Sequence, residues 1–379
     1  MDKKIKTLLS TILVTTSFFT FGAFSQNAFA ATIPYVESQT VFDDVKAVSR
    51  DIDVTTDAGV VICGEGNTEG FYGLYVAKLD SAGNKTWQKT IPNAEVGNSI
   101  QQTRDNCYIA VSSSGHVVKL DSEGNLVWDK VLSNSKQLNC IEPTKDGNFI
   151  ISGCSESNTT KFDAYLCKID ADGNVIFSYS YDDGNSNDNF GQSVQQTVDG
   201  GYIIVGSAFL PIIKNSYTYH YSYNYLIKVD KNGNLLWKKS VGPANAMPKD
   251  LKITKDGSFI IAGNIDNKGV LLKTSSAGNL LWSKTLNDWS IDSVELDTDG
   301  FMLLGTVNGS AFSSDLDLQV MKTDLSGNKV WDYETTEYNA IDCSRSIVKA
   351  LDGSFFMVGD TRADKGYGSA NITFMKVSY

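Results

Sequence analysis

Two stretches decide the fold: DGGYIIVG at 199–206 and YLIKVDKNGNLLWKK at 225–239. Both alternate Val, Ile, Leu and Tyr with polar residues over short runs, which is typical of β-strands and not of helices. An Asp-Gly turn opens the first stretch, and an Asp-x-x-Gly-Asn turn divides the second. Together with SVQQT at 193–197, they predict a unit of four antiparallel strands.

The same pattern recurs along the whole chain. A lysine recurs in seven copies, at intervals of 41 to 60 residues, and in six of them the second turn and an aromatic residue follow it. The lysines are Lys78, Lys119, Lys168, Lys228, Lys273, Lys322 and Lys376, and the aromatic residues are Trp87, Trp128, Phe177, Trp237, Trp282 and Trp331. We therefore predict an all-β, seven-bladed β-propeller with four-stranded antiparallel blades.

The seventh copy lacks its fourth strand. It contains DGSFFMVG at 352–359 and ITFMKVSY at 372–379, and then the sequence ends. We expect the segment 31–40 to supply the missing outer strand, with Tyr35 at the seventh aromatic position. Pairing of the N- and C-terminal strands closes the ring and removes exposed sheet edges. Residues 31–379 are thus predicted to form a single propeller domain.

The first thirty residues have the features of a secretory signal. Lys3, Lys4 and Lys6 precede an apolar stretch at 8–24, and Ala28-Phe29-Ala30 matches a cleavage site. We expect residues 1–30 to be a signal peptide. The mature chain is then secreted, either released or retained at the cell wall, with no later segment long enough to span a membrane.

Charge and composition limit the classes of partner and cofactor that the chain is expected to bind. Without residues 1–30 the chain has 30 basic and 43 acidic residues, a net charge of −13, which repels phosphates and disfavours nucleic acid. The only two histidines, His116 and His220, leave little basis for a zinc site or histidine-dependent hydrolysis. We expect no metal, no cofactor and a monomer.

The six cysteines permit two interpretations. They are Cys63, Cys107, Cys140, Cys154, Cys167 and Cys343. Most lie within apolar strand patterns, where cysteine serves as a small buried side chain, and this favours free thiols. An even number in an exported chain leaves disulfides as the alternative.

The most regular residues indicate scaffold functions. The Asp-x-x-Gly-Asn phrase predicts a type I turn with a bulge, and we interpret DADGN at 170–174 as such a turn and not as a calcium loop. The aromatic column is expected to pack on the neighbouring blade. The lysine stems are expected to cover apolar surface while their ammonium groups stay in water.

Candidate site residues lie where the copies differ, on the face opposite the two tight turns and at the mouth of the central channel. Five tyrosines alternate along one predicted strand and share one of its faces: Tyr217, Tyr219, Tyr221, Tyr223 and Tyr225. They suit stacking on a sugar or docking of a protein. The alternative is an elongated hairpin whose rings cover its neighbours.

Two further sets of residues are weaker candidates. Asp182, Asp183 and Asp188 can offer oxygens to calcium, although a polar crossing loop explains them as well. The second set consists of polar residues at matching positions of the innermost strands. Their side chains either reach the channel or form hydrogen bonds and ion pairs with one another between the blades: Asp53, Gln101, Glu142, Gln195, Lys252 and Glu295.

The repeated phrase resembles the PQQ-like and delta-60 repeats of bacterial secreted β-propellers, over nearly all of 31–379. Asp230 to Trp237 is similar to the tryptophan-docking motif of quinoprotein dehydrogenases. Those enzymes have eight blades and a pair of adjacent cysteines, whereas this sequence has seven copies and no adjacent cysteines. The resemblance therefore implies a shared scaffold and not a shared chemistry.

These observations favour a non-enzymatic binding or scaffold protein that holds a glycan or an extracellular protein on the variable-loop face. The sequence contains no Gly-x-Ser-x-Gly elbow, metal-ligand spacing or phosphate loop. The alternative is an extracellular enzyme of propeller fold, active on a glycan or dependent on a quinone. Paired carboxylates at the channel, such as Glu142 and Glu295, would be its candidate acid and base.

Overall fold

The computed structural model divides the chain into two compact units, Met1–Thr32 and Ile33–Tyr379. The residues that it describes all belong to the second unit: 34–42, 44–68, 70–156, 161–182, 188–214, 217–266, 268–287, 289–308, 316–334, 341–362 and 370–379. They form 28 strands. Within these ranges there is no helix that is long and apolar enough to cross a membrane.

The strands form seven four-stranded antiparallel sheets, as predicted. Blades 1 to 3 contain β2 (Lys46–Val54), β3 (Val60–Thr68), β4 (Phe71–Leu79) and β5 (Lys85–Pro92); β6 (Gly97–Gln102), β7 (Tyr108–Ser112), β8 (His116–Leu120) and β9 (Leu126–Val131); and β10 (Gln137–Pro143), β11 (Phe149–Glu156), β12 (Phe162–Ile169) and β13 (Val175–Tyr181).

Blades 4 to 6 repeat this order with longer strands in blade 4. They contain β14 (Asp188–Gln196), β15 (Tyr202–Lys214), β16 (Tyr217–Val229) and β17 (Leu235–Ala244); β18 (Met247–Ile253), β19 (Phe259–Ile265), β20 (Lys268–Thr274) and β21 (Leu280–Leu286); and β22 (Trp289–Leu296), β23 (Gly300–Asn308), β24 (Leu316–Asp324) and β25 (Lys329–Glu334).

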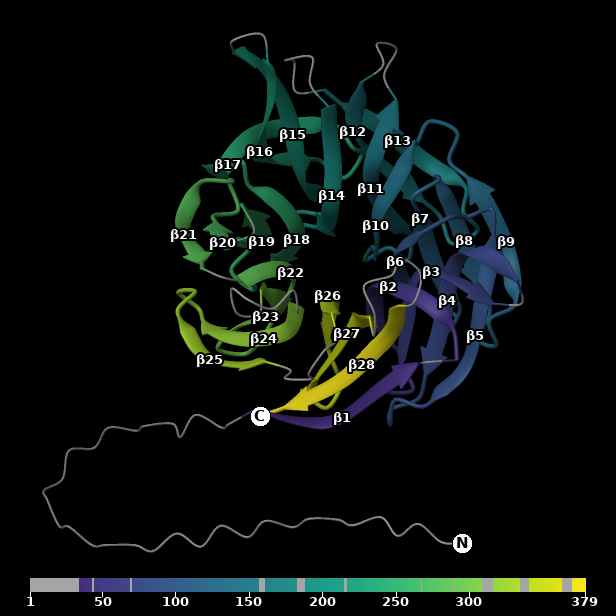
Figure 1. Cartoon of the computed structure of the whole chain (residues 1–379). Coiled ribbons are helices and arrows are strands. Elements are labelled where there is room, and N and C mark those ends of the chain that lie inside the picture. The colour runs from purple at the N-terminus through teal and green to yellow at the C-terminus, as the bar shows by residue number, and fades with distance from the viewer. Residues whose placement is uncertain are drawn as a thin grey trace, which may run out of the picture. The chain divides into compact units, whose positions relative to one another are not determined.

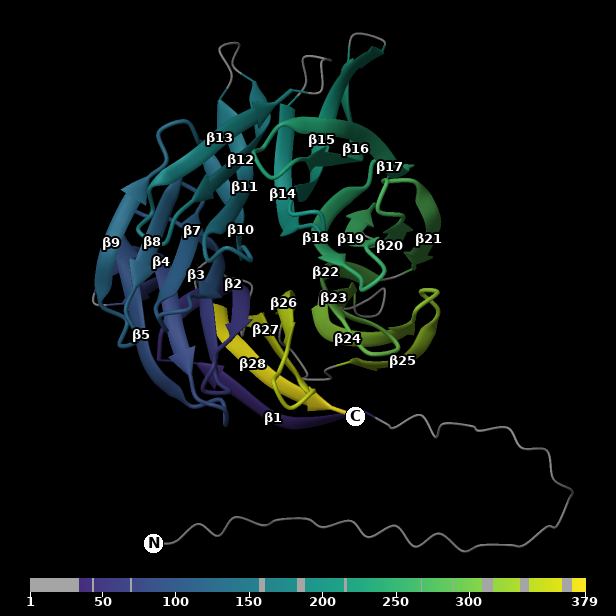
Figure 2. The same cartoon turned by 180° about the vertical axis from the view of Figure 1, so that it is seen from behind.

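Blade 7 joins the two ends of the propeller unit. It contains β26 (Ile341–Lys349), β27 (Phe355–Arg362), β28 (Ala370–Ser378) and, as its outer strand, β1 (Tyr35–Phe42). The predicted closure of the ring is therefore confirmed (Figure 1). Figure 2 shows from behind that the first strand of a blade lies nearest to the centre, as β2, β10, β14, β18, β22 and β26 illustrate.

The hydrophobic core lies between the blades. Seven clusters of buried residues each combine side chains from two adjacent blades. Val61 and Cys63 of blade 1, for example, pack with Ile100 and Tyr108 of blade 2. Each blade therefore buries both of its faces only when the ring is complete.

The predicted turns are confirmed. In the turn at 230–234, Asp230 accepts hydrogen bonds from the backbone N–H groups of Asn232 and Asn234, and Gly233 has a φ of 84°. The register shifts at the residue after Lys228, as expected for a bulge. The segment 170–174 forms the same turn, capped by Asp170.

The lysine column differs from its prediction. All seven ammonium groups form ion pairs of 2.6 to 3.6 Å with the aspartate in the turn between the first and second strands of the same blade. The lysine side chains are only 3 to 16% exposed, so the expectation that the ammonium groups stay in water is wrong. Each pair ties the third strand to the first turn of its blade.

The aromatic column packs on the neighbouring blade, as predicted. Trp87 lies against Gly124 in the turn of blade 2, and its indole N–H donates to the carbonyl of Ser122. The position assigned to Tyr35 is wrong. Lys376 faces Ser38 across the β1–β28 ladder, Tyr35 is 57% exposed, and Phe374 covers the turn glycine of blade 1 instead.

Candidate functional site

Every innermost strand contains a β-bulge, and the bulged residues line the candidate site in the central channel. In blade 1 the register shifts between Ser49 and Asp51, so Arg50 has no partner in the ladder. Gly64 lies opposite, and a Cβ there would approach the carbonyl oxygen of Val48 to 1.9 Å. Glycine closes the repeated phrase in six of the seven copies, so the sequence allows this close approach almost everywhere.

The bulges place three rings of side chains around the central channel. The first ring, which we call the bulge ring, contains Arg50, Asn98, Asn139, Gln192, Lys249, Asp292 and Arg345. The next residue of each strand forms the middle ring: Asp51, Ser99, Cys140, Ser193, Asp250, Ser293 and Ser346. Two positions further on is the deep ring: Asp53, Gln101, Glu142, Gln195, Lys252, Glu295 and Val348.

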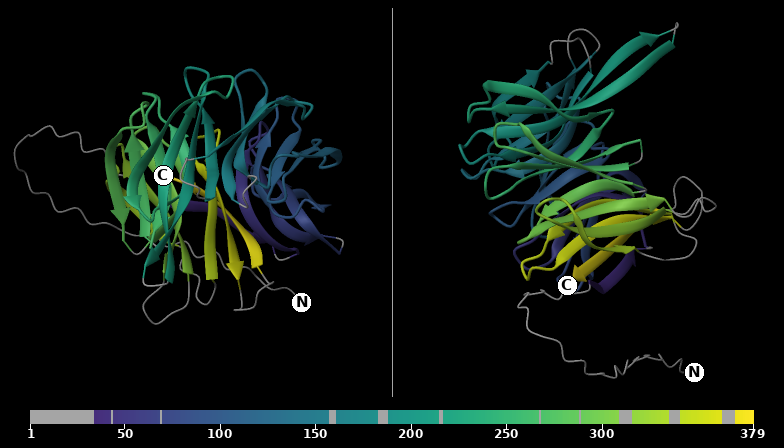
Figure 3. Two further views of the ribbon diagram at one scale, coloured as in Figure 1. Left: turned by 90° about the horizontal axis from the view of Figure 1, so that it is seen from above. Right: turned by 90° about the vertical axis from the view of Figure 1, so that its left-hand side faces the viewer.

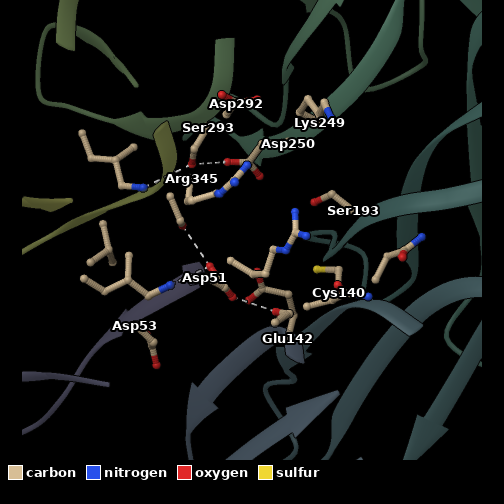
Figure 4. Close-up of a pocket in the computed structure, with 18 of the residues that line it drawn as sticks. Asp51, Asp53, Cys140, Glu142, Ser193, Lys249, Asp250, Asp292, Ser293 and Arg345 are labelled. Atoms are coloured by element: carbon tan, nitrogen blue, oxygen red, sulfur yellow. Dashed lines mark hydrogen bonds between the residues drawn. The ribbon is translucent and has the colours of Figure 1, made fainter. Parts of the chain in front are cut away.

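These rings line one cavity of about 330 Å³ (Figure 4). Each innermost strand starts at a crossing between blades and ends at an Asp-Gly turn. The bulge ring is therefore nearest to the variable-loop face, and the deep ring is nearest to the turns. The cavity is thus the channel mouth that the sequence indicated, although the sequence did not reveal its bulge ring.

The middle ring holds the blades together by hydrogen bonds. Asp51 accepts from Ser99 of blade 2 and from Ser346 of blade 7, both at 2.9 Å. Asp250 repeats this across the ring by accepting from Ser293 of blade 6 at 3.0 Å. Burial raises the pKa of Asp51, although the four hydrogen bonds to its carboxylate oppose that effect.

The deep ring is paired and also faces the cavity. Gln195 donates to Glu142 at 2.8 Å, and Lys252 lies 3.2 Å from Glu295. Both interpretations of this column are therefore correct in part, since the side chains line the channel and also satisfy one another between blades. Burial raises the pKa of Glu142 to about 8 and that of Asp53 to about 7.

Charge is unevenly distributed among the rings. The bulge ring contains three basic residues, Arg50, Lys249 and Arg345, and one acid, Asp292. The two inner rings contain five acids and one lysine. The channel therefore has a cationic mouth above a carboxyl-rich interior.

The raised pKa of Glu142 predicts that stability falls with rising pH. The folded protein retains the proton up to about pH 8, whereas the unfolded chain loses it near 4.5. Stability from this group is thus complete below pH 4.5 and is lost towards pH 8. One pKa unit corresponds to about 1.4 kcal/mol. Because the Glu142 carboxyl faces the channel, we expect less than the full effect, namely a decrease of about 2 to 3 kcal/mol in the free energy of unfolding between pH 5 and 8.

Urea unfolding of wild type and Glu142→Gln at pH 5 and 8 checks this expectation. The amide retains the oxygen that accepts from Gln195 but cannot ionise, so the variant should lose much less stability at pH 8. Below pH 4 both proteins should weaken, because hydrogen bonds from Lys376 and Ser354 lower the pKa of Asp352 to about 2. Equal pH profiles between 5 and 8 would contradict the role of Glu142.

The tyrosine ladder lies on β16, in the predicted elongated hairpin with β15, which projects beyond its neighbours (Figure 3). Tyr225 is only 4% exposed and belongs to the core between blades 3 and 4, and Tyr223 packs against the same core. These two rings therefore serve packing. The side chains of Tyr217, Tyr219 and Tyr221 lie outside the described part of the structure, and their binding function stays a prediction.

The other sequence candidates do not converge on the channel. Asp182 and Asp188 are described, and Asp188 accepts from the backbone of Phe162, but Asp183 lies outside the described residues. No group of metal-ligating side chains occurs in the described ranges. All six cysteines are free, three of them buried, and Cys140 faces the channel.

The fold and the site define a β-propeller with a polar channel. Comparisons with known proteins agree with the propeller fold. A family model described as outer membrane protein assembly factor BamB matches residues 72–246 and 222–372. These matches cover most of the chain, which therefore belongs to this family of PQQ-like repeats. A search of the curated proteins finds no match.

Several solved structures share the fold at low identity. A streptogramin B lyase structure matches with a TM-score of 0.62 and 13% identity, covering 91% of this chain and 98% of that one. A catalytically inactive virginiamycin B lyase from Staphylococcus aureus with quinupristin gives 0.61 and 12%, covering 90% and 99%. The WD40 propeller domain of Doa1 gives 0.61 and 10%, covering 92% and 97%.

Proposed function

We propose that this protein is an exported, non-enzymatic binding protein whose ligand enters the channel mouth on the variable-loop face. The carrying observation is the bulge ring, which places seven polar side chains from seven blades around one cavity of about 330 Å³. Polar groups that converge on a cavity can fix the orientation of a bound ligand. The signal-like segment at 1–30 supports export.

The family supports a binding function. Its model carries the description of an assembly factor, and an assembly factor works through contacts with other proteins. A histidine-to-alanine variant of the Staphylococcus aureus lyase is described as catalytically inactive. No histidine lines the described channel of this chain, where His116 pairs instead with Asp129 on an outer part of blade 2.

An enzyme remains the second candidate because of one observation. Glu142, with its pKa raised to about 8, is a carboxyl that retains a proton at neutral pH inside a cavity, as a general acid does. An enzyme predicts that Glu142→Gln binds its ligand but does not convert it. A binding protein predicts unchanged ligand after prolonged incubation with wild type.

A steric block of the mouth tests the proposed function. Gln192→Trp places a large ring in the bulge ring without changing charge, and Lys231→Trp places the same ring on a turn of the opposite face. Wild type is screened against glycan arrays and extracellular proteins, and each ligand found is titrated against both variants. We expect Gln192→Trp to weaken binding at least tenfold and Lys231→Trp to leave it unchanged.

A variant of the tyrosine ladder tests the alternative binding site, on the β15–β16 hairpin. A triple Ser variant at Tyr217, Tyr219 and Tyr221 removes the ladder rings other than Tyr223 and Tyr225, which pack against the core, and changes no residue that lines the channel. Loss of binding in this variant alone would move the site from the channel to the β15–β16 hairpin. Full binding by Gln192→Trp would contradict the proposed channel site.

A further inference from the structure

The bulge ring carries an unusual concentration of positive charge for an acidic protein. The whole chain has a net charge of −11, yet three of the four charged residues in this ring are basic. Arg50 and Arg345 come from blades 1 and 7, which are neighbours because the ring closes there. Lys249 comes from blade 5, and Asp292 of blade 6 lies between it and Arg345 in the order of the ring, so the cations occupy one side of the mouth; Figure 4 labels Lys249, Asp292 and Arg345.

The two arginines are close enough to repel each other. Burial, and next the charge of Arg345, lower the pKa of Arg50. Both arginines contribute to the lining of the cavity. An anion placed between them would relieve this repulsion, and guanidinium groups match the two oxygens of a carboxylate.

The acids near these cations neutralise them only in part. Arg345 donates through Nε to Asp360 at 2.7 Å, a contact that does not use its two terminal nitrogens. The guanidinium of Arg50 lies 3.8 Å from the carboxylate of Glu65, which is a long distance for an ion pair, and the Arg50 side chain is 38% exposed. Lys249 forms no ion pair among the described residues, and its side chain is exposed.

Below the mouth, carboxyls, amides and hydroxyls line the cavity together with one cation, Lys252, which is paired with Glu295. Asp250 and Ser293 lie in the middle ring, and Glu142 and Gln195 lie in the deep ring. Aromatic side chains are lacking among the described residues of the lining, so stacking on a ring does not contribute there. Because five acids and only one lysine line the two inner rings, N–H or O–H donors suit the inner end of a ligand that fills the cavity.

We infer that the channel binds a small carboxylate whose opposite end carries hydrogen-bond donors, with the carboxylate held by Arg50, Arg345 and Lys249. Hydroxy acids, sugar acids and amino acids share this chemistry. The cavity of about 330 Å³ lies at the low end of the range for small-molecule sites. This inference rests on the proposed function, because it names the ligand class of the same channel.

Calorimetric titration with five defined probes tests the inference. Sodium D-glucuronate and glycine combine a carboxylate with hydroxyl or ammonium donors, D-glucose lacks the carboxylate, and acetate lacks the donors. Sodium chloride at equal ionic strength controls for screening. We expect glucuronate or glycine, or both, to bind at least tenfold more tightly than glucose and acetate, and the difference between these two identifies the donor.

Three charge variants locate the binding. Arg50→Gln removes a cation whose only described ion pair is long, and Lys231→Gln removes one from a turn on the opposite face. Loss of a charge-assisted contact should weaken carboxylate binding about tenfold or more in Arg50→Gln and not in Lys231→Gln. Lys249→Gln, at an exposed position in blade 5, should also weaken binding and guards against a local folding effect at Arg50.

The outcomes separate this inference from the proposed function. Equal affinity for glucuronate and glucose, or unchanged affinity in both Arg50→Gln and Lys249→Gln, would overturn the carboxylate site and leave a channel-binding protein. Absence of binding by every carboxylate probe at millimolar concentration would also overturn the inference. The proposed function fails separately, when ligands from the wider screen still bind Gln192→Trp.

Discussion

A chain that begins at Asp44, without β1, is expected to lose its folded state or to aggregate. β1 pairs along its length with β28 and supplies the only outer strand of blade 7. Its last residue, Phe42, is 6% exposed and packs with Phe374 in the core between blades 7 and 1. Loss of one buried phenylalanine side chain costs about 3 to 5 kcal/mol. Removal of the whole strand also exposes the edge of β28.

The matched control begins at Pro34 and retains β1. Both chains are compared by circular dichroism, thermal melting and light scattering. We expect a cooperative transition for the control and its loss for the shorter chain. A synthetic peptide of residues 34–42 should restore part of the transition, because it supplies the missing strand in trans. An unchanged melting temperature in the shorter chain would mean that β1 does not close the ring.

The repeat allowed the fold to be predicted because its residues act locally. Asp230 and Gly233 specify a turn whatever the rest of the chain does, and Lys228 and Trp237 face each other across that hairpin. Six copies of this hairpin, together with the incomplete seventh copy, fix the number of blades. The closing strand lies outside this pattern, because β1 joins β28 from the other end of the chain. Its position opposite the lysine is Ser38, three residues after Tyr35, so β1 has no aromatic residue there to mark its register.

The site was only partly predictable for a related reason. The deep ring was visible as a column because Asp53, Gln101 and Glu142 occupy matching positions in successive copies. Arg50 and Arg345 share with Asn98 nothing but polarity, so no repeated residue type indicates the bulge ring. A glycine lies opposite six of the seven bulges and is a usable signal, because its lack of a side chain leaves room for the bulged strand.

Gly278→Ala is expected to destabilise the propeller more than a glycine substitution in an open turn. Gly278 has a φ of 76°, a conformation that costs a residue with a side chain about 1 to 2 kcal/mol. A Cβ there would also lie 2.6 Å from Trp237 of the preceding blade. Displacing the indole ring of Trp237 from its packed position against Gly278 adds an overpacking cost of about 1 to 3 kcal/mol. We therefore expect a total loss of roughly 2 to 5 kcal/mol.

Gly200→Ala separates the two contributions to this loss. Gly200 has a φ of 82°, close to that of Gly278, but no atom lies within 4 Å of the position that its Cβ would take. Its substitution should cost only the backbone contribution, about 1 to 2 kcal/mol in urea unfolding. Trp237 fluorescence should change in Gly278→Ala and not in Gly200→Ala, because only the first substitution moves the indole. Equal losses in both variants would show that the ring shifts freely, and the aromatic column would then contribute little to joining the blades.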